Sequence, residues 1–89
     1  MPGTWKADPS ARFHRRLGPS AAELGVTDGK LECPDIWQLD NGDVAVIGKD
    51  LTEHYGPHLP EDVLLAPDER LVVIPGRMLS AAKADIPDA

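Results

Sequence analysis

Two short apolar runs, IWQL and VAVI, flank a polar stretch centred on Asn41-Gly42. This pattern predicts a β-hairpin over residues 36–48. A two-residue hairpin loop requires a positive φ at both positions, and Asn and Gly adopt that conformation most readily. With these two residues as the loop, Ile36 lies directly across from Ile47, so the polar stretch predicts the register as well as the hairpin.

This register sorts the hairpin side chains onto two faces. One predicted face is apolar throughout and should lie in the core, with Trp37 largely buried; it carries Trp37, Leu39, Val44 and Val46. The other predicted face is mixed and carries Ile36, Gln38, Ala45 and Ile47. A slip of one residue would exchange the two faces, so the turn decides which side of the sheet is buried.

Beyond the hairpin, residues 70–74 are predicted to form a strand. They are apolar on both faces, which is typical of a strand inside a sheet or beneath a cover. Residues 62–65 are a candidate to pair with it as a second hairpin. In the polar stretch before them, Asp50 and Glu53 resemble a capping box for a helical turn over residues 51–55.

The last predicted element is an amphipathic helix over residues 77–86, ended by Pro87. Its apolar residues fall within about 100° of arc on a helical wheel; they are Met78, Leu79, Ala82 and Ile86. The expected fold class is therefore α+β: a small antiparallel sheet of three to four strands with a C-terminal amphipathic helix and a short N-terminal helix.

At the N-terminus, residues 9–17 are predicted to form that short helix, with Asp8 as its N-cap and Pro9 as its first residue. A further helical turn is expected over residues 20–24, with Gly25 at its end. We expect residues 1–30 to form a basic helical segment and residues 31–89 a small acidic domain of sheet and helix.

The charge of the chain supports this division. The net charge is −6. Residues 1–30 hold five basic and three acidic residues, or +2, and residues 31–89 hold four basic and twelve acidic residues, or −8. An acidic body repels DNA and anionic membranes and suits a basic protein surface, although the same charge also serves solubility alone.

No combination of residues in the sequence predicts catalysis or metal binding. Cys33 is the single cysteine, so neither an internal disulfide nor a cysteine-based zinc site can form, and it is expected to be a small buried residue. His54 and His58 are four residues apart, but Gly56-Pro57 should break a helix between them. We predict no zinc site, no cofactor and no enzymatic activity.

The first seventeen residues are charged and contain no apolar stretch, which fits neither a signal peptide nor a membrane anchor. The expected location is the cytoplasm, without contact with a membrane.

The order of motifs in the C-terminal half is also informative. Cys33 opens a short strand, Val44-Ala45-Val46 follows with Asp50 nearby, and Ile74-Pro75 leads into the last helix. In this order the chain resembles a family of small acidic actinobacterial proteins, known as a domain of unknown function, whose genes commonly lie beside helix-turn-helix regulators of the Xre class.

The chain departs from the pattern of that family at several points. Position 47 is Ile where the family has Arg, the last helix has no aromatic residue, and the loop of residues 50–69 is longer. The N-terminal arginine segment has no counterpart. The resemblance implies a non-enzymatic accessory protein or antagonist that binds a transcriptional regulator.

The leading functional hypothesis is therefore a protein-interaction module with a partner such as a basic DNA-binding regulator. Its candidate partner-binding residues are Ile36, Ile47, Arg12, Phe13, Arg15 and Arg16. One alternative is a small nucleic-acid-associated protein that uses the arginines, although the −8 body disfavours direct phosphate contact. A small enzyme is the remaining alternative, and the arginines could also form a plain solvated helix face.

Overall fold

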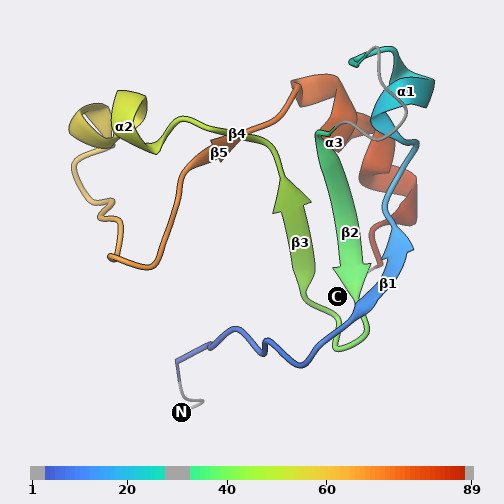
Figure 1. Ribbon diagram of the computed structural model, residues 1–89, viewed down its shortest axis with the longest axis horizontal. Coiled ribbons are helices and arrows are strands. Elements are labelled where there is room, and N and C mark those ends of the chain that lie inside the picture. Colours follow the sequence, from blue (N-terminus) through green and yellow to red (C-terminus); the bar gives the residue numbers. More distant parts are fainter. Residues whose placement is uncertain (1–3, 28–32, 88–89) are drawn as a thin grey trace.

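The computed structural model describes residues 4–27 and 33–87 (Figure 1). A three-stranded antiparallel sheet has the order β1-β2-β3, and two further strands pair as a second small antiparallel sheet. The α+β class predicted from the sequence is confirmed. The elements are β1 Phe13–Arg16, α1 Ala21–Leu24, β2 Asp35–Leu39, β3 Val44–Ile47, β4 Lys49–Asp50, α2 Thr52–Tyr55, the 3-10 helix η1 Gly56–His58, β5 Val72–Val73, α3 Gly76–Ala82 and the 3-10 helix η2 Lys83–Asp85.

The N-terminal segment forms a strand where a helix was predicted. Strand β1 pairs with β2, placing Phe13 beside Leu39, so the helix over residues 9–17 is wrong. Asp8 does not cap a helix, because its carboxylate accepts hydrogen bonds from the backbone and hydroxyl of Ser10 in a local turn. Pairing with β2 also brings Leu17 into the core, where it is 3% exposed. This tertiary gain outweighs a weak local helix propensity.

The short helix predicted after this segment is confirmed as α1. The Ser20 hydroxyl accepts from the backbone N–H of Glu23, and the Glu23 carboxylate accepts from the backbone N–H of Ser20. These two bonds form a capping box. Gly25, at φ +70°, ends the helix in the left-handed conformation that glycine adopts without strain.

The hairpin of β2 and β3 is confirmed, but its loop has three residues and its predicted register is wrong. The Gly42 N–H donates to the Leu39 carbonyl, and the Leu39 N–H donates to the Asp43 carbonyl. Gly42 has φ +92°, whereas Asn41 keeps a negative φ. This is a turn followed by a left-handed glycine, which is the usual three-residue hairpin loop. Ile36 consequently lies opposite Val46.

The one-residue difference redistributes the side chains between the two faces. The inner face, which α3 covers in part, carries Ile36, Gln38, Val44 and Val46. The outer face carries Arg16, Asp35, Trp37, Ala45 and Ile47. The predicted core face is therefore split between the two sides: Trp37 is only half-buried, and Val44 and Val46 are exposed. Ile36, assigned to the mixed face, is buried.

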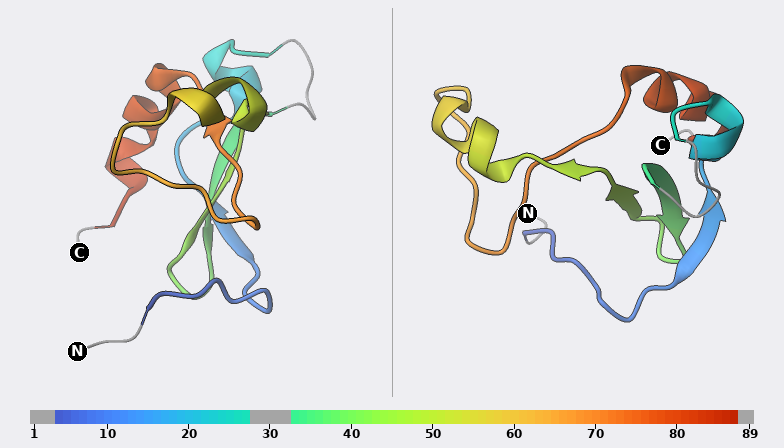
Figure 2. Two further views of the ribbon diagram at one scale, coloured as in Figure 1. Left: turned by 90° about the vertical axis from the view of Figure 1, so that its left-hand side faces the viewer. Right: turned by 45° about the horizontal axis from the view of Figure 1, so that its top comes forward.

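The core lies between the inner face and α3, on the side of β1 and β2. It consists of Leu17, Ala21, Ile36, Met78 and Ala82. Residues from both predicted parts of the chain thus share one core. The predicted C-terminal helix is confirmed, and Figure 2 shows it on one side of the sheet.

Gly18 allows the chain after β1 to approach α3 closely. A Cβ atom at Gly18 would lie 2.9 Å from the Cα of Ala82. The backbone N–H of Gly18 also donates to the Asp85 carboxylate at 2.8 Å. The position therefore requires glycine for space as well as for its φ of +79°.

Residues 49–73 form an arm that extends away from the sheet and α3 (Figures 1 and 2). The predicted strand near residues 70–74 exists as β5, but it pairs with β4 and not with residues 62–65. The helical turn predicted near residues 51–55 is confirmed as α2. Gly56-Pro57 does not stop it, because the chain continues as η1.

The arm makes the molecule less compact than most domains of its size. Its radius of gyration is 14.7 Å, against roughly 12 Å for a compact chain of this length. Val72 and Val73, predicted to lie inside the sheet, are each 40% exposed. No helix of the described residues is long and apolar enough to cross a membrane.

Candidate partner-binding groove

An open apolar groove runs between β3 and α3 on the inner face and has a volume of about 570 Å³. Here "the groove" means the surface formed by Ile36, Val44, Val46, Ile74, Leu79 and Ile86. The sheet supplies its floor, and α3 with the chain that follows supplies one wall.

The groove exists because α3 covers only part of the inner face. Met78 and Ala82 pack over Ile36 and leave the β3 side chains beyond the reach of the helix. Val44 is 53% exposed and Leu79 is 57% exposed, although both belong to apolar stripes that predict burial. Contiguous exposed apolar surface of this kind marks interaction sites in soluble proteins.

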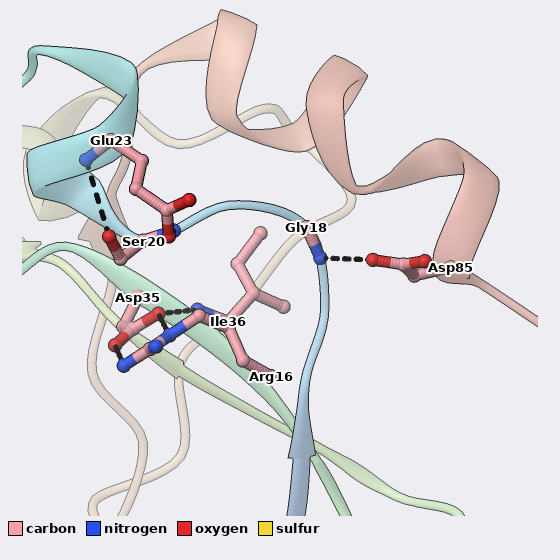
Figure 3. Close-up of polar contacts among 7 residues, drawn as sticks. All are labelled: Arg16, Gly18, Ser20, Glu23, Asp35, Ile36 and Asp85. Atoms are coloured by element: carbon pink, nitrogen blue, oxygen red, sulfur yellow. Dashed lines mark hydrogen bonds and ion pairs between the residues drawn. The ribbon is translucent and has the colours of Figure 1, made fainter.

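Polar contacts beside the groove fix η2, which directly follows α3, against the sheet. The Arg15 guanidinium donates through Nε to the Gln38 side-chain oxygen at 3.1 Å and through Nη2 to the Asp85 carbonyl. The Asp85 carboxylate accepts from Gly18 (Figure 3). Arg15 therefore links β1 to β2 and to η2.

On the outer face, Trp37 is covered by its neighbours on β1. The Arg16 guanidinium carbon lies 4.8 Å from the centre of its ring, and the Phe13 ring meets it edge-on at 5.7 Å. Arg16 also forms a two-pronged ion pair with Asp35 at 2.9 and 3.0 Å (Figure 3). Burial opposes ionisation of Asp35, but the bonds from Arg16 and its other neighbours outweigh it and lower the pKa of this carboxyl.

The structure places the six predicted partner-binding residues on different surfaces. Phe13, Arg16 and Ile47 are on the outer face, where Ile47 is 44% exposed. Arg15 and Ile36 are on the inner face, and Ile36 is 4% exposed in the core.

The predicted pair of Ile36 with Ile47 does not form, because Ile47 lies opposite Asp35. Arg12 lies just before β1, where its backbone N–H donates to the Asp40 carboxylate. Arg15 and Arg16 both have internal partners, which disfavours their use as phosphate-binding groups.

Sequence reasoning missed the groove because it assigned four of the groove residues to the core. Val44 and Val46 were placed on the buried face, and Leu79 and Ile86 on the buried side of the helix. One signal was present in the sequence. A helix of about ten residues with a small alanine, Ala82, in its apolar stripe is too short to cover three strands.

The arm carries six of the fifteen acidic residues of the chain. Residues 49–73 contain six acidic and two basic residues, a net charge of −4.

The capping box predicted for α2 is absent, because Asp50 accepts from the hydroxyl and backbone N–H of Thr52 and pairs with Arg70 at 2.9 Å. The bonds from Thr52, and then that from Arg70, lower the pKa of Asp50 to about 2.

The residues considered for metal binding lie apart from the groove. His54 and His58 are both exposed, and the His54 ring meets Tyr55 edge-on at 4.7 Å. No group of three or more His, Cys, Asp or Glu residues within the described ranges is placed to hold a metal ion. Cys33 is exposed, so the prediction that it is buried is wrong.

Comparison of the chain with protein-family models, curated proteins and solved structures finds no match. The resemblance to the actinobacterial family therefore stays a prediction.

Proposed function

We propose that this protein is a non-enzymatic interaction module that binds a segment of a basic partner protein in the groove. The observation that carries this proposal is the exposed apolar surface between β3 and α3, which residues 4–27 and 33–87 leave uncovered. Completing the burial of the four exposed side chains, Val44, Val46, Leu79 and Ile86, contributes roughly 4 kcal/mol to a complex.

The total surface of the chain also supports an extended interface. Its accessible surface is 7220 Å², whereas a compact monomer of 9.6 kDa exposes about 5100 Å². The excess is larger than the roughly 800 Å² that each partner contributes to a standard interface. In the arm, Leu64 is 89% exposed.

The negative charge of the chain favours a basic partner. The net charge is −6, and the arm holds −4 of it. An acidic protein associates faster with a basic surface than with a neutral one. A helix-turn-helix regulator, which the family resemblance implies, is a basic DNA-binding protein and is the first partner to test.

Two neighbouring residues of β3 provide a matched test. Val46 and Ile47 are 42% and 44% exposed but lie on opposite faces of the sheet. Val46→Asp places a carboxylate in the groove, and Ile47→Asp places the same group on the outer face. Partner affinity should fall at least about tenfold in Val46→Asp, because the new charge loses its water on binding. It should change little in Ile47→Asp.

The experiment starts with capture from host lysate by wild type and both variants, and the retained protein is identified by mass spectrometry. Its binding segment is then purified and measured against the same three proteins, after circular dichroism has verified that all three fold. Loss of binding in Ile47→Asp alone would move the site to the outer face. A retained partner without a basic segment would contradict the proposed charge selection.

A further inference from the structure

We propose that the partner segment binds as an extended strand that adds to the free edge of β3. This inference rests on the proposed function, because it specifies how the groove is occupied. Strand β3 ends the sheet order β1-β2-β3, and no other strand of the described residues pairs with its far side.

The hydrogen bonds of β2 show which backbone groups of β3 face that edge. The Leu39 N–H donates toward β3, whereas the Ile36 carbonyl and the Asp40 N–H bond toward β1. Since alternate residues direct their backbone groups to opposite sides of a strand, Ala45 faces β2 and its neighbours on either side face outward. Val44 and Val46 therefore present their N–H and C=O groups at the free edge.

This edge lacks the side chains that normally protect one. Natural edge strands carry lysine, proline, a bulge or an inward-pointing charge that prevents another strand from pairing. Residues 44–47 read VAVI and contain none of these. The edge is thus a template for one more strand.

The free edge and the groove belong to the same residues. Val44 and Val46 offer their backbone groups at the edge, and their side chains form the floor of the groove. Since residues opposite each other share a face, an added strand would place every second side chain beside these valines and toward Leu79 and Ile86. A segment with alternating apolar residues fits this arrangement.

The charge of the arm favours basic side chains at the alternate positions of the partner segment, between its apolar residues. Figure 1 shows the arm on the β3 side of the sheet, beyond the free edge. Its net charge of −4 favours lysine or arginine between the apolar residues. A second copy of this chain fits less well, because two copies at −6 each repel one another.

The first test uses a matched pair of variants. The probe is a synthetic nine-residue peptide of alternating valine and lysine, with a fluorescent label, measured by fluorescence polarisation. Val46→Pro removes an outward N–H and no bond to β2, and edge strands tolerate proline. Val46→Thr keeps that N–H in a side chain of similar shape. We expect about tenfold weaker binding by Val46→Pro than by Val46→Thr, for one lost hydrogen bond and a steric block.

The second test leaves the protein unchanged. N-methylation of the peptide on one alternate set of nitrogens removes the donors that face β3, and methylation of the other set removes only outward donors. Binding should be lost with one set and retained with the other. Loss with the valine set indicates antiparallel addition, and loss with the lysine set indicates parallel addition.

Several results would overturn strand addition. These are equal binding by Val46→Pro and Val46→Thr, equal binding of both methylated peptides, tighter binding of a helical leucine-lysine peptide, or no binding at millimolar peptide. Wild-type dimers that Val46→Pro converts to monomers in sedimentation would assign the edge to a second copy. If Val46→Asp loses the natural partner but Val46→Pro and Val46→Thr both keep it, the groove remains the docking site and only strand addition fails.

Discussion

The two faces of the three-stranded sheet cover their apolar side chains in different ways. On the outer face, Trp37 is covered by Arg16 and Phe13 from the adjacent strand, and Arg16 is neutralised by Asp35. On the inner face, the apolar side chains of β3 have no such neighbours and depend on a helix that stops short of them. Long cationic side chains can complete an exposed face locally, whereas an aliphatic face needs another element of structure.

The largest effect is expected at the centre of the inner face. Ile36→Ala should reduce the free energy of unfolding by about 3 kcal/mol, because it leaves a cavity beneath α3. That is a large share of the roughly 5 kcal/mol expected for a domain this small. Urea denaturation measures it. A loss smaller than that of Trp37→Ala would reverse the proposed roles of the two faces.

Gly18→Ala should have the next largest effect, about 2 kcal/mol. The new methyl group would meet the Ala82 backbone, and φ would remain at +79°, which alanine rarely adopts. Thermal unfolding should show the loss. Gly25→Ala is the control, because it carries a similar strain with open space around its Cβ position. Equal losses in the two variants would mean that contact with α3 contributes nothing.

On the outer face, Trp37→Ala should cost only about 1–2 kcal/mol, because the side chain is half-buried and its partners remain solvated. Urea denaturation of Trp37→Ala and Ile36→Ala under one set of conditions compares the faces directly. Phe13→Ala, which removes the edge-on ring alone, should cost less than Trp37→Ala. The reverse order would show that Phe13 has a larger role in the core than its 63% exposure indicates.

The smallest effect concerns the ion pair of the outer face. Asp35→Asn should cost about 0.5–1 kcal/mol at pH 7, since Arg16 remains partly exposed. The folded-state pKa of Asp35 lies below 3.8, so its contribution is present above that pH and is lost as the pH falls through the folded value. The urea midpoints of wild type and variant should therefore differ at pH 7 and converge as the pH falls below the folded-state pKa of Asp35. A constant difference would mean that ionisation of Asp35 is not responsible.

Capping residues, turn residues and apolar spacing predicted the elements whose structure depends on residues close in the sequence. Helix α1 follows from Ser20, Glu23 and Gly25, and helix α3 follows from its apolar spacing. The hairpin was predicted from Asn41-Gly42, but Asp40 fits a loop as well as a strand. Assigning it to the strand shifts the register by one residue and groups Trp37 with Val44 and Val46 in place of Ile36, so the inner face, and with it the groove, could not be predicted.

Other errors concern pairings between segments far apart in the sequence. Residues 13–16 pair with a strand more than twenty residues away, and β4 pairs with β5 across the whole arm. No pattern within either segment distinguishes such a partner from a nearer one. The candidate site depends on these pairings, because they decide which apolar residues remain uncovered.

The free edge of β3 also affects how the protein behaves in concentrated solution. Open edges of apolar strands pair with one another between molecules. Here the mutual repulsion of the acidic chains opposes this pairing. That repulsion disappears near the isoelectric point of about 4.8. Turbidity should rise steeply on acidification toward this pH, and less so in Val46→Pro, whose edge cannot pair. Under the proposed function, the same acidic charge governs both colloidal stability and the choice of partner.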